Sequence, residues 1–151
     1  MQTRIIPSSE LIINDDGSVF HLHLRPEQIA DTVILVGDPA RVATVSAMFD
    51  SVECRASNRE FNTVTGSYRG KRMSVLSTGI GIGNIDICVT ELDALANVDF
   101  ATRTVRERKR RLNLVRLGTS GALQPDIAVG EVVYSATSVG FDGLLNFYER
   151  R

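Results

Sequence analysis

Three short apolar segments, each ending at a glycine, most constrain what this chain can fold into. They are TVILVG (32–37), MSVLSTG (73–79) and LNLVRLG (112–118). Short apolar runs rich in valine, isoleucine and leucine are typical of strands buried on both faces of a sheet. The first two runs are each followed by apolar residues at helical spacing, Val42 with Val45 and Ile85 with Val89. Strands that alternate with helices predict an α/β fold containing parallel strand pairs.

Two further strand signals define the rest of the predicted sheet. Residues 61–78 alternate on both sides of Arg69-Gly70-Lys71, which predicts a β-hairpin. Another strand is predicted at 131–140 (EVVYSATSVG), and no helical pattern follows it to cover the sheet. The predicted fold class is therefore α/β, with a mixed central sheet and flanking helices. We expect a single domain (1–151) that is incomplete at its C-terminus.

Composition excludes several classes of protein. The net charge of the 151-residue chain is -1, which argues against a protein that mainly coats nucleic acid or an anionic membrane. No apolar run approaches the roughly 20 residues that span a bilayer. The basic segment RTVRERKRR (103–111) has no aromatic residue between its charges, so we interpret it as a solvated surface segment rather than a nucleic-acid site. Cys54 and Cys88 fit no metal-binding spacing, which predicts free thiols in a reducing, cytoplasmic setting, with both cysteines in the core.

The glycine-rich segment STGIGIGN (77–84) invites comparison with nucleotide-binding loops. A dinucleotide fingerprint, G-x-G-x-x-G, would require glycine at position 84 or 86, where the chain has Asn84 and Asp86. The Walker A pattern is also absent, because no Gly-Lys-Ser/Thr follows. The remaining interpretation is a strand-to-helix turn whose backbone and helix N-terminus could approach an oxyanion. A turn without any ligand explains these glycines equally well.

Arginines near two other strand ends favour an anion-binding site. Arg41 lies one helical turn beyond Gly37, and Arg116 lies inside the strand that ends at Gly118. Open α/β sheets bind ligands at the carboxyl ends of their strands, and the planar guanidinium pairs two phosphate oxygens at once. Ordinary surface ion pairing is the alternative for each arginine alone. For Arg116 we expect a buried charge with a partner, because it lies within an apolar strand.

Five motifs in order resemble those of uridine phosphorylases, within the wider nucleoside phosphorylase family. They are FHLHL, VGDPARV, ASNREF, STGIGIGN and LVRLGTSGALQPDIAVGEVV, and the similarity runs from about residue 20 to residue 142. FHLHL and NREF favour the uridine branch over the purine branch. The resemblance implies a nucleoside phosphorylase-like fold and the phosphorolysis of a pyrimidine nucleoside, in which uridine and phosphate give uracil and ribose 1-phosphate. It also implies a purine nucleoside phosphorylase-type enzyme as an alternative.

The resemblance assigns roles to matching positions of this chain. The phosphate-binding residues it implies are Gly37, Arg41, Arg59, Arg116 and Thr119, of which Arg41, Arg116 and Thr119 would serve catalysis. The nucleoside-binding residues it implies are His21, Thr119, Ser120 and Gly121. His21 would reach the ribose 5′-hydroxyl in a neighbouring subunit, and Arg59 would likewise be lent across a dimer interface. Glu60 matches an acid that helps to hold a monovalent cation, K⁺, at that interface.

The resemblance also carries expectations about cofactors, assembly and missing parts. No cofactor is required for the chemistry, and we expect a homodimer or a trimer of dimers with phosphate and a nucleoside as the only other partners. Residues 98–111 would be a charged insertion. The family's later segments, which bind ribose and base, find no match before Arg151. A non-catalytic binding or assembly module therefore stays open as a function. His21 and His23 form an H-x-H pair on one face of a predicted strand. A zinc site there is disfavoured, because the sequence holds no further histidine and no clustered cysteines.

Overall fold

The computed structural model describes residues 4–149 of the chain. Its contacts divide the chain into two compact units, one ending at Leu117 and the other beginning at Gly118. All the described strands lie in the first unit, and the described part of the second holds one short 3₁₀ helix, η2 (Leu144–Phe147). None of the described helices is long and apolar enough to cross a membrane.

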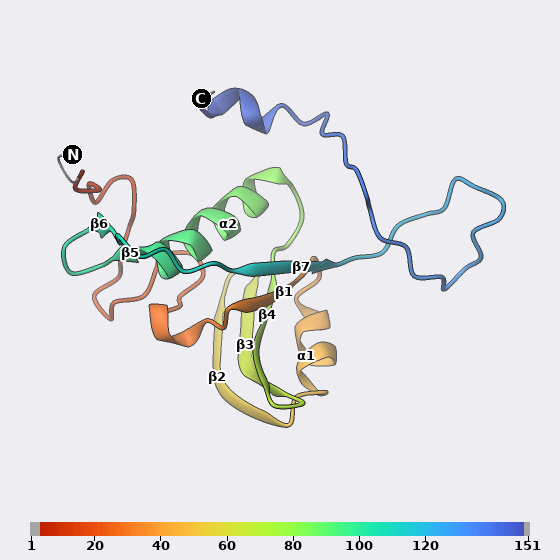
Figure 1. Ribbon diagram of the computed structural model, residues 1–151, viewed down its shortest axis with the longest axis horizontal. Helices are drawn as coiled ribbons and strands as arrows, with labels where there is room; N and C mark the ends of the chain where they lie inside the picture. Colours follow the sequence, from red (N-terminus) through yellow and green to blue (C-terminus); the bar gives the residue numbers. More distant parts are fainter. Residues whose placement is uncertain (1–3, 150–151) are drawn as a thin grey trace. The chain divides into compact units, whose positions relative to one another are not determined.

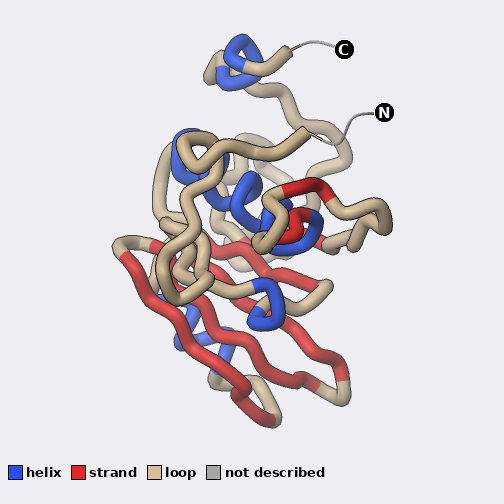
Figure 2. Tube along the Cα trace, turned by 90° about the vertical axis from the view of Figure 1, so that its left-hand side faces the viewer, coloured by secondary structure: helices blue, strands red, loops and turns tan. Residues whose placement is uncertain are grey.

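The first unit is built on a five-stranded mixed sheet. Its strands are β1 (Thr32–Val36), β2 (Ser51–Asn58), β3 (Phe61–Tyr68), β4 (Lys71–Ser77) and β7 (Asn113–Leu117). Their order in the sheet is β2-β3-β4-β1-β7 (Figure 1), and Figure 2 shows the strands from a direction turned by 90°. Strand β1 is parallel to both β4 and β7, whereas β3 is antiparallel to β2 and β4. This arrangement confirms the predicted α/β class and its mixed central sheet.

Two helices cover opposite faces of this sheet (Figure 1). Helix α1 (Ala40–Ser46) packs Val42 against a small cluster formed by Val36, Val64 and Val75. Helix α2 (Ile82–Asn97) packs against the larger core on the other face. That core holds Leu11, Val19, Leu22, Leu24, Ile29, Val33, Leu35, Phe61, Leu76, Cys88, Leu92, Ala94, Leu95 and Val98. Because successive side chains of a strand point to opposite faces, Val33 and Val36 of β1 serve different clusters.

The predicted hairpin is confirmed as β3 and β4. Arg69 and Gly70 connect the strands with φ angles of 48° and 75°. Positive φ at both central positions is the geometry of the type I′ turn, which matches the right-handed twist of the flanking strands.

Three local predictions from the sequence were wrong or incomplete. Residues 131–140 form no strand, since every described strand of the chain ends at or before Leu117. The FHLHL segment (20–24) is a turn rather than a strand, and His23 has a φ of 50°. Strand β2 was not predicted. It is an edge strand with mostly exposed residues, and its alternating apolar residues Val52, Cys54 and Ala56 are only exposed or half-buried.

The cysteines differ in environment. Both are free thiols, and burial raises the pKa of the Cys88 thiol to about 12. Cys88 therefore stays protonated and packs as a small apolar residue, as predicted. Cys54 is half-buried outside the core clusters, and its Sγ contacts the carbonyl oxygen of Gln28 at 3.6 Å.

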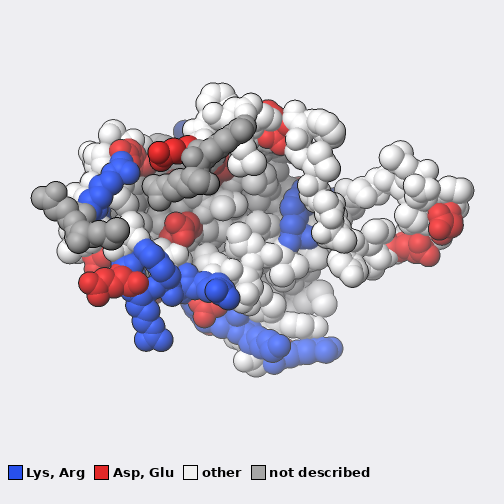
Figure 3. Space-filling model, turned by 45° about the horizontal axis from the view of Figure 1, so that its top comes forward, with Lys and Arg blue, Asp and Glu red and all other residues white. Residues whose placement is uncertain are grey.

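The basic segment is partly anchored rather than wholly solvated. It contains β6 (Thr104–Val105), which pairs with β5 (Val98–Asp99). Arg103 donates to the carbonyl oxygens of Ile6 and Leu11, and Arg110 pairs with Asp31. The expectation of a solvated segment is therefore wrong for these two arginines. On the face shown in Figure 3, basic side chains gather in a row across the lower part of the view, with acidic side chains beside them.

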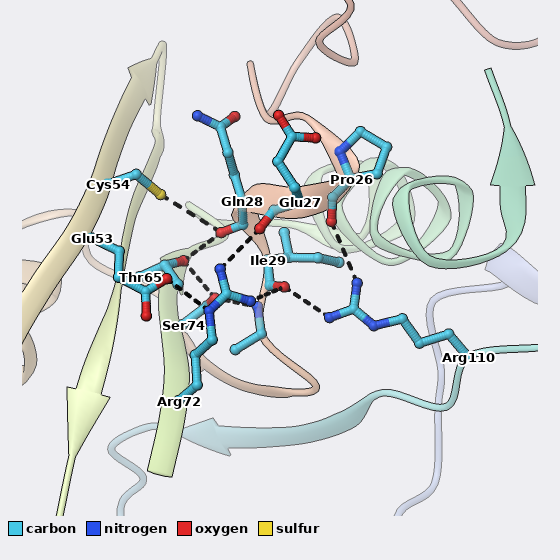
Figure 4. Close-up of polar contacts among 11 residues, drawn as sticks. Pro26, Glu27, Gln28, Ile29, Glu53, Cys54, Thr65, Arg72, Ser74 and Arg110 are labelled. Carbon is cyan, nitrogen blue, oxygen red and sulfur yellow. Dashed lines mark hydrogen bonds and ion pairs between the residues drawn. The ribbon is translucent and has the colours of Figure 1, made fainter. Parts of the chain in front are cut away.

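Two arginines clamp the connection that enters β1 (Figure 4). This connection contains the 3₁₀ helix η1 (Pro26–Gln28). Arg72 donates to the carbonyl oxygens of Glu27 and Ile29 at 2.9 and 2.8 Å, and its Nε donates to Glu53 at 2.7 Å. Arg110 donates to the same Ile29 oxygen at 2.8 Å from the other side. Carbonyls outside regular secondary structure thus gain charged donors.

We expect Arg72→Ala to lower the free energy of unfolding by about 2 kcal/mol, because it leaves two carbonyls without their charged donor. Urea denaturation followed by circular dichroism would measure the change. The matched control is Lys71→Ala, an exposed neighbour on β4, for which a change within about 0.5 kcal/mol is expected. Equal effects of the two substitutions would show that the carbonyl contacts contribute nothing specific.

Candidate functional site

The carboxyl ends of three parallel strands meet at one edge of the sheet. Val36 at the end of β1 pairs with Ser77 of β4 on one side and with Leu117 of β7 on the other. The connection through α1 runs on one face of the sheet, and the connection through α2 runs on the opposite face. Adjacent strands whose connections leave to opposite faces create the crevice where open α/β sheets bind ligands.

Gly37 lies between the other two strand ends. A methyl group placed on Gly37 would lie 3.6 Å from Nη2 of Arg116 and 3.8 Å from the carbonyl oxygen of Gly79. The structure therefore brings together the three glycine-bearing strand ends that the sequence singled out. A residue with a bulky side chain at position 37 would fill the space between the β1 loop and the Arg116 guanidinium.

The predicted phosphate arginines occupy three different elements. Arg41 is half-buried in the first turn of α1, Arg59 lies at the turn between β2 and β3 with a φ of 54°, and Arg116 lies on β7. Arg116 is exposed, so the expectation of a buried and paired charge was wrong. The reason is topological, because β7 is an edge strand of the sheet. Its one neighbouring strand, β1, flanks it on one side only.

Arg41, Arg59 and Arg116 form no ion pair within residues 4–149 of the structure, a property that they share with six other described arginines. The only side-chain contact recorded for them is the bond from Nη1 of Arg116 to the carbonyl oxygen of Leu117 at 3.3 Å. The arginines that do form ion pairs are Arg4, Arg25, Arg72 and Arg110. Guanidinium groups without a carboxylate are free to bind another anion.

Glu60 lies beside the glycine-rich loop, next to Arg59. Its Oε1 accepts a hydrogen bond from the side-chain amide of Asn84 at 2.7 Å. The backbone amide of Glu60 and this Asn84 contact hold the pKa of the Glu60 carboxyl below its usual range. Gly79, with a φ of 66°, lies so close that a methyl group there would be 2.8 Å from both Cγ of Glu60 and Nδ2 of Asn84. Only glycine fits this position without displacing both side chains.

His21 is held by a buried acid on α2. Nδ1 of His21 and Oε1 of Glu91 lie 2.7 Å apart, and the His21 side chain is 27% exposed. Asn58, from the ASNREF motif, donates to the carbonyl oxygens of Phe20 and His21 at 3.2 and 2.9 Å. Glu91 from α2 and Asn58 from the ASNREF motif, both far from His21 in the sequence, therefore hold the histidine and its backbone in place.

The remaining predicted residues lie elsewhere in the chain. Thr119, Ser120 and Gly121 belong to the unit that begins at Gly118, and each is exposed. His23 is exposed, and no group of three or more His, Cys, Asp or Glu residues in the described part of the chain could hold a metal ion. The geometry of residues 4–149 therefore adds nothing in favour of zinc.

Sequence reasoning missed Glu91 and Asn58. A signal for Glu91 was present, because it lies on the apolar stripe of α2 three residues after Cys88 and four before Leu95. A carboxylate on a buried helix face requires hydrogen-bond donors, so its position predicts a polar partner. Asn58 gave no such signal, because its partners are backbone carbonyls of a turn that was predicted as a strand.

Comparison with known proteins decides the family. The family model described as "Phosphorylase superfamily" matches residues 31–150. The chain belongs to this superfamily. The chain is 33% identical over 143 residues to the uridine phosphorylase of Thermococcus kodakarensis, covering 95% of this chain and 47% of that protein. It is 36% identical over 119 residues to a purine nucleoside phosphorylase, DeoD-type, of Bacillus velezensis, covering 78% of this chain and 46% of that protein.

A solved structure gives the same assignment for the fold. It is a Trypanosoma brucei nucleoside phosphorylase that is described as showing uridine phosphorylase activity. It superposes on this chain with a TM-score of 0.72 and 34% identity, covering 78% of this chain and 41% of that one. The chain thus spans about half the length of the curated relatives it matches.

Proposed function

We propose that this chain carries the phosphate-binding half of a nucleoside phosphorylase site. The observation that carries the proposal is the meeting of Gly37, Gly79 and Arg116 at the carboxyl ends of three adjacent parallel strands. Gly37 and Gly79 carry no side chain that would occupy this space, and the nearby Arg116 guanidinium has no carboxylate partner among the described residues. Membership of the phosphorylase superfamily supports phosphate as that anion.

The proposed mechanism requires positioning and charge rather than covalent catalysis. Arg41, Arg59 and Arg116 would hold phosphate and partly neutralise it, and the Thr119 hydroxyl would donate to it. Phosphate then attacks the anomeric carbon of the nucleoside while the base departs with the electrons of the glycosidic bond. Holding the two reactants in line accounts for much of the rate. No organic cofactor takes part in this displacement.

We propose uridine as the nucleoside. The FHLHL and NREF motifs and the 33% identical uridine phosphorylase support a pyrimidine substrate. Ser120 and Gly121 would border the base. The similarity to a DeoD-type enzyme keeps a purine nucleoside as the competing substrate, so the choice requires a direct comparison of uridine with inosine.

We also propose that the site is completed by a second copy of the chain. Arg59 and His21 would act across the interface of a homodimer, alone or within a trimer of dimers. Glu60 would help to hold K⁺ there, since its Oε2 is not used by Asn84. Sedimentation velocity with and without K⁺ would test this assembly.

The test of the proposed function is the titration of the 151-residue chain with inorganic phosphate by isothermal calorimetry. We expect one phosphate per chain with a dissociation constant in the millimolar range or below, competition by sulfate and no competition by chloride. Production of uracil from uridine by the same chain would exclude a non-catalytic module, and faster cleavage of inosine would assign the purine branch. Failure to bind phosphate would overturn the proposal at its base.

A further inference from the structure

The buried acid Glu91 has a role that the phosphate site does not explain. Glu91 is 7% exposed and lies on the core-facing side of α2. It accepts from the backbone amide of Leu22 at 2.8 Å and from that of His21 at 3.1 Å, in addition to its contact with the His21 ring. All of these donors belong to the FHLHL segment, some 70 positions away in the chain.

This arrangement determines which ring nitrogen of His21 carries the proton. The two backbone amides are obligatory donors, so the group that faces them must be an acceptor, as an ionised carboxylate is. Nδ1 of His21 contacts the same carboxylate at 2.7 Å and must therefore donate to it. In the neutral imidazole the other nitrogen, Nε2, then has no proton and accepts hydrogen bonds.

The ring is also fixed in space, next to an open volume. The Phe20 ring packs edge-on against it with centroids 4.9 Å apart, and the Phe61 ring lies on another side at 6.4 Å. His21 and Glu91 line a cavity of about 250 Å³ together with Phe20 and Thr90. A fixed ring beside a cavity can present Nε2 to a ligand without a further loss of side-chain entropy.

We infer that Glu91 is a positioning residue, which holds His21 in the Nδ1-protonated tautomer so that Nε2 accepts a hydrogen bond from a hydroxyl group of the bound nucleoside. The substrate part of this inference rests on the proposed function, whereas the tautomer does not. The pair would select a ligand that carries a hydroxyl donor at this point over a ligand that lacks it.

The first test is ¹⁵N NMR of the two histidine rings at pH 8. The chain contains only His21 and His23, so a His21→Ala variant assigns both sets of signals. We expect Nδ1 of His21 to be protonated. In Glu91→Gln the amide oxygen must serve the backbone amides, its NH₂ group then faces Nδ1, and the proton moves to Nε2. The matched control is Asp93→Asn, an exposed carboxylate two positions along α2, which should leave the tautomer unchanged. A proton on Nε2 of His21 in the unmodified chain would overturn the inference.

The second test compares uridine with 5′-deoxyuridine in the presence of saturating phosphate. We expect the unmodified chain to bind uridine about tenfold more tightly, the effect of one hydrogen bond, and Glu91→Gln to lose most of this preference. Asp93→Asn should retain the preference. Equal binding of the two nucleosides by the unmodified chain would overturn the substrate part of the inference while phosphate binding remained intact. Binding of neither nucleoside would overturn the proposed function together with that part, and the NMR result would still decide the role of Glu91.

Discussion

Arg116→Ala is expected to weaken phosphate binding about 100-fold. The guanidinium supplies paired, charged hydrogen-bond donors, and such bonds each contribute about 1.5–3 kcal/mol. Arg116 forms no ion pair in the described structure, and its only side-chain hydrogen bond is one to the neighbouring carbonyl oxygen of Leu117. The substitution should therefore remove affinity without disturbing the fold. Isothermal calorimetry with inorganic phosphate would give the dissociation constants.

The matched control for this prediction is Arg111→Ala. Arg111 is also exposed and lies two residues before β7. Its replacement by alanine removes one positive charge, as Arg116→Ala does. If Arg111→Ala weakened phosphate binding as much as Arg116→Ala, the affinity for phosphate would depend only on the net charge of the chain. The phosphate affinity of Arg116→Lys should lie between that of Arg116→Ala and that of Arg111→Ala, because lysine keeps the charge but lacks the planar guanidinium group.

The fold was predictable where the local sequence and the packing environment agree. β1, β3, β4 and β7 carry apolar or alternating patterns, and each was found. The turn at residues 69–71 was predictable because Gly70 can adopt a positive φ. Strand β2 and the turn at FHLHL were not predictable, since backbone pairing and the Glu91 contact define them rather than their own composition.

The candidate site was predictable only as a set of separate strand ends. Glycines after apolar runs marked the loops, and the rule for parallel sheets placed those loops at one edge. The exposure of Arg116 was missed, because an apolar strand sequence does not reveal whether the strand lies at the edge of the sheet. The contacts of Glu60 with Gly79 and Asn84 join residues 19 and 24 positions apart, and no periodic pattern encodes them.

Gly66 offers the sharpest test of the sheet that supports this site. It lies within β3, opposite the irregularity that separates Val52 from Cys54 in β2. A methyl group on Gly66 would lie 2.1 Å from the carbonyl oxygen of Ser51 and 2.8 Å from a ring carbon of Phe49. A glycine inside a strand commonly marks such a close backbone approach. The Ser51 oxygen belongs to the backbone, so no side-chain rotation can relieve the contact.

Gly66→Ala is therefore expected to destabilise the chain by about 3 kcal/mol, at the upper end for overpacked sites, because β2 must move away from β3. That is a large fraction of the 5–15 kcal/mol that stabilises a typical domain. Chemical denaturation followed by circular dichroism would measure the loss. The control is Gly83→Ala in α2, where a methyl group would meet nothing within 4 Å and where alanine should stabilise the helix by about 0.5–1 kcal/mol. If Gly66→Ala were as stable as the unmodified chain, the β2–β3 pairing described here would be wrong.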